Sequence, residues 1–119
     1  SALIACVRPS EKAQYPLTSI EDYVAWRRAD GLPSDPWVRT HVRLGGRIVR
    51  TSPRSMTVVG TVVQWATWTG MEFPASGDYI VPGAGAVVAI NRDADLGVHH
   101  EPGIWIVHEL SGYDGAVRA

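Results

Sequence analysis

The chain opens with a continuous apolar run at residues 2–7. A run of this kind, without alternating polar residues, is typical of a β-strand that is covered on both faces. Such a strand needs neighbours in a sheet, yet nothing precedes it in this sequence. Its neighbours must therefore come from strands later in the chain or from another polypeptide.

The composition predicts one globular domain over residues 1–110 and a flexible tail at 111–119, which contains two glycines and little apolar content. The net charge of −1 gives no overall field that would recruit nucleic acid or a membrane surface. No stretch is apolar enough to span a membrane, and no signal peptide is visible. Cys6 has no second cysteine to pair with, so we expect a cytoplasmic protein. Because Cys6 lies within the apolar run, we expect its thiol to be buried and unreactive.

The most clearly bounded element is a short helix after Asp35. Asp35 is suited to capping the free N–H groups of a helix, and Pro36 to the first helical position, where no N–H is needed. Gly45 and Gly46 supply the left-handed residue that ends a helix. Both ends of this helix are therefore predicted.

Two further helices are expected. A capping box at residues 18–21 predicts a helix over roughly 19–28. The region 60–70 is ambiguous, because its β-branched residues favour a strand whereas the three-residue spacing of its tryptophans puts them on one helical face. We favour a short helix that Gly70 ends.

Strands are predicted at 47–50 and 56–59, on either side of a turn at 52–54. Three more are predicted, and the second of them is expected to form a hairpin with the third: 78–82, 86–90 and 103–109. Together these elements indicate an α+β domain on a mixed, mostly antiparallel central sheet with about three short helices.

The strand at 2–7 followed by a helix with an RLGG-type stop resembles the second half of acyl-CoA-dependent N-acyltransferases of the GNAT superfamily. The resemblance covers residues 3–110 and would make them a C-terminal half-domain. It is carried by scattered residues that include Leu3 to Ser10, Lys12, Asp30 to Pro33, Asp35 to Trp37, His41 to Gly45, Gly60 to Val63, Trp65, Trp68 to Met71, Phe73, Pro74, Ser76, Gly77, Tyr79, Pro82 to Ala84, Gly97, Val98, Glu101, Pro102, Trp105 and His108.

The resemblance implies transfer of an acyl group from acyl-CoA to a small-molecule amine, with no metal. In that superfamily the equivalent of the first strand splays from its neighbour, and the gap admits the pantetheine arm. By this resemblance, Arg8, Ser10 and Lys12 would bind the cofactor beside the gap. A missing N-terminal half or a second polypeptide, in an oligomer, would complete the enzyme.

The chain departs from the superfamily where CoA phosphates bind. The superfamily uses consecutive N–H groups of a glycine-rich turn at a helix N-terminus, where the dipole favours anions. Residues 44–47 lie at a predicted helix C-terminus, where the dipole repels anions, and residues 83–86 join two strands. We therefore expect this chain to bind acyl-CoA poorly by itself.

The densest group of ionisable side chains is His99-His100-Glu101. In a strand only one of these histidines can share a face with Glu101, and such a histidine is suited to act as a general base on an acceptor amine. We take His99 and Glu101 as candidate catalytic residues, with Tyr79 as the candidate acid, although no spacing singles it out among the tyrosines. Convergence of His99, Glu101 and His108 would instead form a metal site.

Tryptophan is abundant, and Trp68 and Trp105 are candidates for lining a substrate pocket, with core packing as the default for this residue type. Three functions remain open at this point. They are a portion of a GNAT-like acyltransferase, a non-catalytic small-molecule- or protein-binding domain with a GNAT-derived fold, and a small metal-dependent enzyme built on His99, Glu101 and His108.

Overall fold

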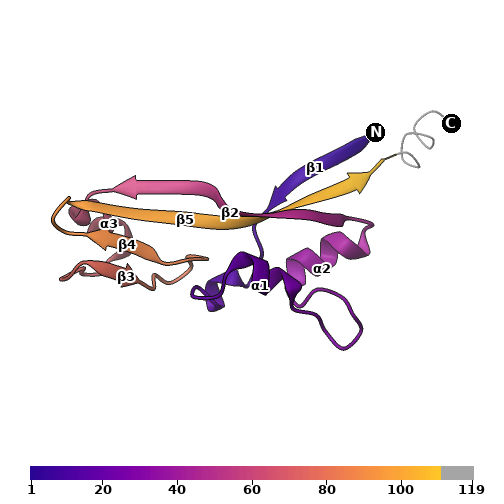
Figure 1. The fold of residues 1–119 in the computed structure, drawn as a ribbon, viewed down its shortest axis with the longest axis horizontal. Coiled ribbons are helices and arrows are strands. Elements are labelled where there is room, and N and C mark those ends of the chain that lie inside the picture. The colour runs from indigo at the N-terminus through magenta and orange to yellow at the C-terminus, as the bar shows by residue number, and fades with distance from the viewer. Residues whose placement is uncertain (111–119) are drawn as a thin grey trace.

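The computed structural model describes residues 1–110, and the predicted tail at 111–119 lies outside that range. The described chain contains five strands, three α-helices and one 3-10 helix (Figure 1). In chain order they are β1 (Ala2–Val7), η1 (Lys12–Gln14), α1 (Ile20–Ala25), α2 (Pro36–Arg43), β2 (Arg47–Gly60), α3 (Val62–Thr69), β3 (Gly77–Tyr79), β4 (Val88–Asn91) and β5 (Leu96–Glu109). The expected α+β class is confirmed, and the arrangement is consistent with a GNAT-like fold.

The central strand of the sheet is β5, and every described pairing between strands is antiparallel. Along one edge, β5 pairs with β2 over most of its length. The opposite edge is shared, because β4 pairs with residues 96–99 and β1 pairs with residues 104–109. Residues 100–103 therefore have no strand partner on that edge, and the sheet has a gap beside them.

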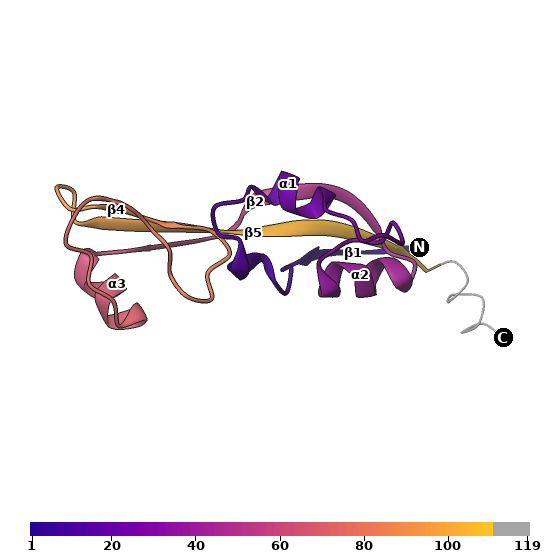
Figure 2. The ribbon, with the colours of Figure 1, turned by 90° about the horizontal axis from the view of Figure 1, so that it is seen from below.

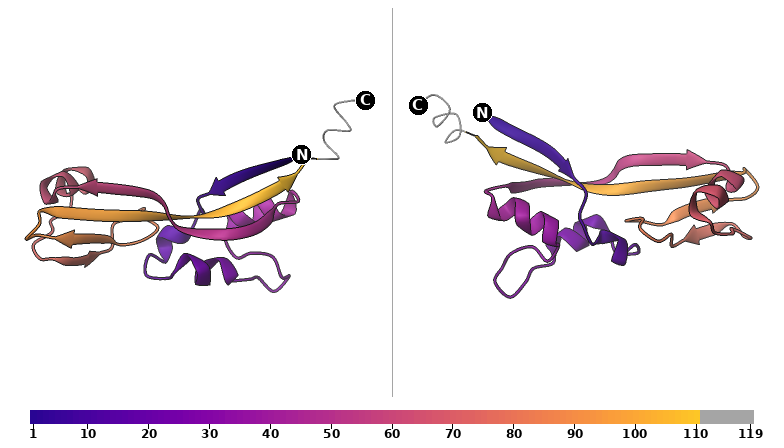
Figure 3. Two further views of the ribbon diagram at one scale, coloured as in Figure 1. Left: turned by 45° about the horizontal axis from the view of Figure 1, so that its top comes forward. Right: turned by 180° about the vertical axis from the view of Figure 1, so that it is seen from behind.

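Two hydrophobic clusters lie towards opposite ends of the long β2–β5 ribbon. In the first, α1 and α2 lie on the same side of the strands, and Val38, Ile104 and Ile106 are at most 1% exposed (Figures 1 and 3). In the second, Trp65 of α3 packs with Val88 of β4. The radius of gyration is 17.9 Å, whereas a compact domain of this length has about 13.5 Å. The molecule is accordingly elongated (Figure 2).

Within the described chain, β1 is an edge strand, because it pairs with β5 alone. Leu3 and Ile4 are 54% and 61% exposed. Alternate residues of a strand point to opposite faces, and Val7 packs in the first cluster, so Cys6 faces away from the helices. The prediction of a buried Cys6 is wrong, since this side chain is exposed. The apolar run forms the expected strand, but residues 1–110 leave much of it uncovered.

The predicted helix after Asp35 is confirmed as α2, with both of its expected ends. The Asp35 side chain accepts hydrogen bonds from the N–H groups of Trp37 and Val38, and Pro36 occupies the first turn. At the other end, Gly45 has a φ of +92°, the left-handed conformation that glycine adopts without strain.

The helix predicted at 19–28 is shorter in the structure. Ser19 is the residue that caps α1, accepting a hydrogen bond from the N–H of Asp22, so the capping box predicted at 18–21 is wrong. Trp26 has an extended backbone, with a ψ of 133°, and this ends α1 at Ala25.

One strand of 14 residues, β2, replaces the two strands and the turn predicted at 47–59. Its pairing with β5 shifts register between Ser52 and Met56, so this segment is a bulge and not a chain reversal. Pro53 and Pro102 both fall inside the irregular segment, and neither has an N–H to donate to the ladder. The turn predicted at 52–54 is therefore wrong. Pro53 does not reverse the chain, because pairing with β5 on either side of it keeps the chain extended.

The helix favoured at 60–70 is confirmed as α3. Thr61 and Gln64 form a capping box at its start, and Gly70 ends it with a φ of +70°. The predicted hairpin also exists, but β5 starts at Leu96, well before residue 103, and it is residues 96–99 that pair with β4. None of the helices in residues 1–110 has the length and apolar character needed to cross a bilayer.

Gly97 on β5 is required because the indole of Trp65 lies against it. A Cβ at this position would lie 2.2 Å from Cδ1 and 2.4 Å from Nε1 of Trp65. We expect Gly97→Ala to lower the free energy of unfolding by about 1–3 kcal/mol, because overpacking displaces a core side chain. Urea unfolding followed by tryptophan fluorescence measures this loss. The control is Val63→Ala, at a position that is 73% exposed, and equal stability of the two variants would contradict the expectation.

Candidate functional site

Three distant segments close the gap in the sheet beside residues 100–103. Arg8 follows the end of β1, Lys12 begins η1, and the loop 83–85 precedes β4. All three contact Glu101 or one another through hydrogen bonds. The gap is thus filled by a cluster of charged side chains and backbone groups.

Glu101 is the centre of this cluster and is 6% exposed. Its carboxylate oxygens accept hydrogen bonds from the N–H of Gly85 at 3.0 and 3.2 Å. Arg8 Nη2 lies 3.4 Å from Oε1, and His99 Nε2 lies 3.2 Å from the same oxygen. A buried carboxylate requires such partners, because an unpaired one is strongly disfavoured away from water.

His99 and Glu101 share a face of β5, as the two-residue spacing predicts. The other ring nitrogen of His99, Nδ1, lies 3.2 Å from the carbonyl oxygen of Val87. Both ring nitrogens therefore face oxygen acceptors. A neutral imidazole carries one N–H and therefore donates to one of these two oxygens at a time. The pair thereby links β5 to the chain entering β4.

The loop 83–85 is fastened by two cations as well as by Glu101. Arg8 Nη2 donates to the carbonyl of Gly83 at 2.6 Å, and Lys12 Nζ donates to the carbonyl of Gly85 at 2.6 Å. Lys12 is 2% exposed. Burial lowers the pKa of Lys12, and the negative charge of Glu101 partly opposes that shift. A Cβ on Gly85 would lie 2.2 Å from Glu101 Oε2, so a larger residue at that position would displace the carboxylate.

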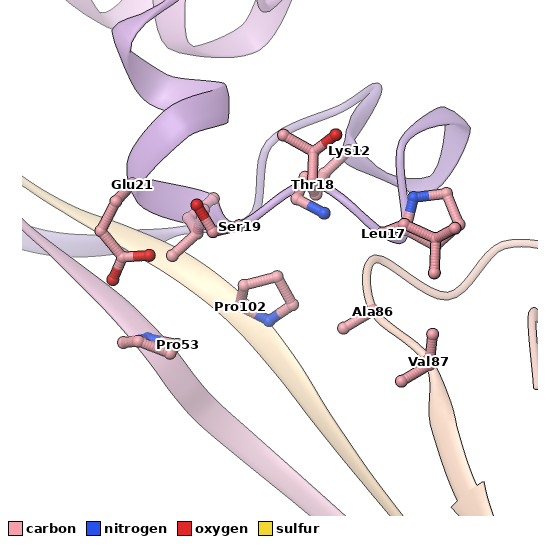
Figure 4. A pocket seen from close by; sticks show the side chains of 11 residues that line it. Lys12, Leu17, Thr18, Ser19, Glu21, Pro53, Ala86, Val87 and Pro102 are labelled. Atoms are coloured by element: carbon pink, nitrogen blue, oxygen red, sulfur yellow. The ribbon is translucent and has the colours of Figure 1, made fainter. Parts of the chain in front are cut away.

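An open pocket of about 270 Å³ lies next to this cluster (Figure 4). Pro102 of β5 lies between Pro53 of β2 on one side and Ala86 and Val87 on the other. The remaining lining residues come from η1, the loop that follows it and the start of α1: Lys12, Pro16, Leu17, Thr18, Ser19, Ile20 and Glu21. A second hollow of about 330 Å³ shares Pro53, Ala86 and Val87 and extends to Arg54 and His100.

Four of the predicted site residues come together here: His99, Glu101, Arg8 and Lys12. The third predicted cofactor residue, Ser10, instead donates to Asp35 through its N–H and its hydroxyl. Sequence reasoning missed the Gly83 and Gly85 carbonyls, because backbone acceptors carry no side-chain signature.

The other candidates lie elsewhere. The Tyr79 hydroxyl donates to the carbonyl of Ala75 at 2.6 Å. Trp68 packs edge-to-face against Trp65, a member of the second cluster. Trp105 lies on β5, opposite Cys6 of β1. The structure therefore does not bring the two tryptophans together in one pocket.

His108 lies apart from His99 and Glu101 and contacts α2. Its Nε2 lies 3.0 Å from Nδ1 of His41, whose ring also packs edge-to-face on Trp37. Burial and the neighbouring His108 lower the pKa of His41. The proposed ligand set of His99, Glu101 and His108 does not converge, and residues 1–110 contain no group of three metal-ligating side chains.

Asp35, which sequence reasoning treated only as a helix cap, organises the segment next to the site. It is 4% exposed and accepts hydrogen bonds from the N–H groups of Ser10, Glu11, Trp37 and Val38, and from the hydroxyls of Ser10 and Tyr23. Burial alone would raise the pKa of Asp35, but the hydrogen bonds from Tyr23 and the backbone outweigh it and hold the pKa below its ordinary value. Burial and the bond to Asp35 raise the pKa of Tyr23.

The fold and the cluster define an α+β domain in which a buried ionic network supports an open pocket at a gap in an antiparallel sheet. No protein-family model and no solved structure matches the chain. The chain is similar to the arginine N-acetyltransferase avaD of Aspergillus versicolor, with 33% identity over 127 residues. The alignment covers 92% of this chain and 44% of that protein, so the chain spans less than half the length of the relative. The similarity relates the chain to an acetyltransferase.

Proposed function

We propose that this chain is one portion of an N-acyltransferase that moves an acyl group from acyl-CoA to a small-molecule amine. The observation that carries the proposal is the similarity, over 92% of the chain, to a protein named as an arginine N-acetyltransferase. The antiparallel α+β fold is consistent with the GNAT superfamily that the sequence resembles. We propose an acceptor that carries a cationic group, as arginine does.

In this proposal the phosphates of CoA are bound outside the described residues. Gly45 follows the C-terminus of α2, and the loop 83–85 turns two carbonyls towards Arg8 and Lys12. Neither offers the free N–H groups that a pyrophosphate needs, so residues 1–110 do not fit this group by themselves.

The exposed edge of β1 is where we place the segment or second polypeptide that completes the enzyme. A strand edge presents unpaired N–H and C=O groups and is a template for another strand. The exposure of Leu3 and Ile4 supports this placement, because apolar side chains on such an edge gain from being covered.

The chain's own contribution is the acceptor side of the site. Glu101 and His99 hold Gly85 and Val87 in place, and we assign them a positioning role for the pocket wall. The side chain of Arg8 is 55% exposed, which supports its predicted role towards the cofactor. The role of Tyr79 as an acid stays a prediction.

The test is acyl-CoA-dependent thiol release with arginine methyl ester as the acceptor. The chain alone is compared with the longer protein of which we propose it is a portion. We expect amine-dependent release of CoA only from the longer protein, because we place the phosphate site outside residues 1–110. Native mass spectrometry of the purified chain checks whether a second polypeptide accompanies it. The proposal is overturned if circular dichroism shows that the longer protein is folded and it neither binds acetyl-CoA nor releases thiol.

A further inference from the structure

The pocket beside the cluster is apolar along most of its walls. The walls are formed by Pro16, Leu17, Ile20, Pro53, Val87 and Pro102. Its volume of about 270 Å³ is slightly below the roughly 300–1,000 Å³ of pockets for drug-sized ligands. It therefore suits a compact molecule of amino-acid size with an aliphatic stem.

Glu21 is the only carboxylate among the residues that line this pocket. It lies in the first turn of α1 and is exposed. The Thr51 hydroxyl on β2 donates to Oε1 of Glu21 at 3.2 Å and so helps to position the carboxylate. No cationic side chain in residues 1–110 pairs with Glu21. Figure 4 shows Glu21 on the side of Pro53 and apart from Lys12.

The other charged groups near the pocket are buried or already paired. Lys12 is 2% exposed, and its Nζ donates to the carbonyls of Tyr15 and Gly85, both at 2.6 Å. The carboxylate of Glu101 is 6% exposed and pairs with Arg8. Among the charged residues that line the pocket, Glu21 is the exposed one and the one that a ligand reaches.

We propose that this pocket binds a compact cationic amine, whose guanidinium or ammonium group pairs with Glu21 while its aliphatic stem lies against Leu17 and the prolines. A guanidinium matches a carboxylate with two parallel hydrogen bonds. The ammonium of Lys12, which lines the pocket apart from Glu21, repels a second cation and thereby orients the ligand. The inference rests on the proposed function in one respect, namely that this molecule is the acyl acceptor.

The test compares arginine methyl ester with citrulline methyl ester, which has the same shape but a neutral urea in place of the guanidinium. Binding to the ¹⁵N-labelled protein is followed by the amide shifts of Leu17, Thr18 and Val87, without acyl-CoA. We expect arginine methyl ester to bind about fivefold more tightly, as for a largely exposed ion pair. Glu21→Gln keeps the acceptor for Thr51 but removes the charge, so the preference should disappear.

Asp22→Asn is the matched control, because it removes the same charge from the same turn of α1 at a residue that does not line the pocket. The control should keep the fivefold preference. The inference is overturned if the pocket amides do not shift, if Glu21→Gln keeps the preference, or if Asp22→Asn loses it equally. This experiment measures ligand binding and no acyl transfer. A negative result therefore contradicts the binding site, whereas absence of thiol release contradicts the proposed function.

Discussion

Replacing Asp35 with alanine is expected to lower the free energy of unfolding by about 3–5 kcal/mol, the sum of a lost helix cap and several buried donors left without an acceptor. The donors come from three segments: the chain after β1 at Ser10 and Glu11, the N-terminus of α2 at Trp37 and Val38, and Tyr23 of α1. No water can replace the carboxylate fully, because Asp35 is 4% exposed. Urea unfolding at neutral pH measures the loss.

The matched control for this substitution is Asp30→Ala. Asp30 also accepts a backbone N–H, from Leu32, and pairs with Arg28, but its side chain is 41% exposed. An exposed pair of this kind contributes about 0–1 kcal/mol. If Asp35→Ala and Asp30→Ala are equally stable, the buried hydrogen bonds to Asp35 stabilise the fold no more than the exposed bonds to Asp30 do.

The same carboxylate predicts a pH dependence. The pKa of Asp35 in the folded state lies below its ordinary value of 3.8, so the unfolded chain binds the proton more readily. The stabilisation is therefore complete above pH 3.8 and is lost as the pH falls towards the folded-state pKa. We expect the stability difference between the wild type and Asp35→Ala to shrink below pH 3.8. A constant difference across that range would contradict the assignment.

Replacing Glu101 with alanine is expected to lower the free energy of unfolding by about 3–5 kcal/mol, as for removal of one partner from a buried ionic group. The N–H of Gly85 and the Nε2 of His99 would lose their acceptor, and Arg8 would lose one partner. Glu101→Gln keeps an acceptor oxygen and should lose less. The measurement is urea unfolding.

Glu109→Ala tests whether the effect depends on burial and not on loss of a carboxylate from β5. Glu109 lies on the same strand but is exposed. Its removal should change the stability by less than about 0.5 kcal/mol, as usual for surface positions. In the Glu101 variants the amide resonances of the loop 83–85 should also shift, because that loop is fastened to the carboxylate. Unchanged loop resonances would show that Glu101 does not hold it.

The site was only partly predictable from the sequence. His99 and Glu101 lie on one face of β5 because residues two apart in a strand always do. Arg8 and Lys12 were assigned by resemblance, and their contacts with the loop 83–85 join residues more than 70 positions apart. No local pattern encodes such a contact. The position of Glu21 at the pocket could not be predicted either, because the other pocket walls come from distant strands.

The sequence by itself determined both ends of α2, the C-terminal end of α3 and the strand character of β1. Asp35, Gly45 and Gly70 act on the backbone within a few residues, through side-chain caps and left-handed dihedral angles, so their effect does not need the rest of the fold. Tertiary structure decided that β2 continues through Pro53, that Cys6 is exposed, and that Arg8 and Lys12 meet His99 and Glu101 at the gap in the sheet. These outcomes depend on which strand β5 pairs with at each point along its length, and that pairing is a property of the whole sheet.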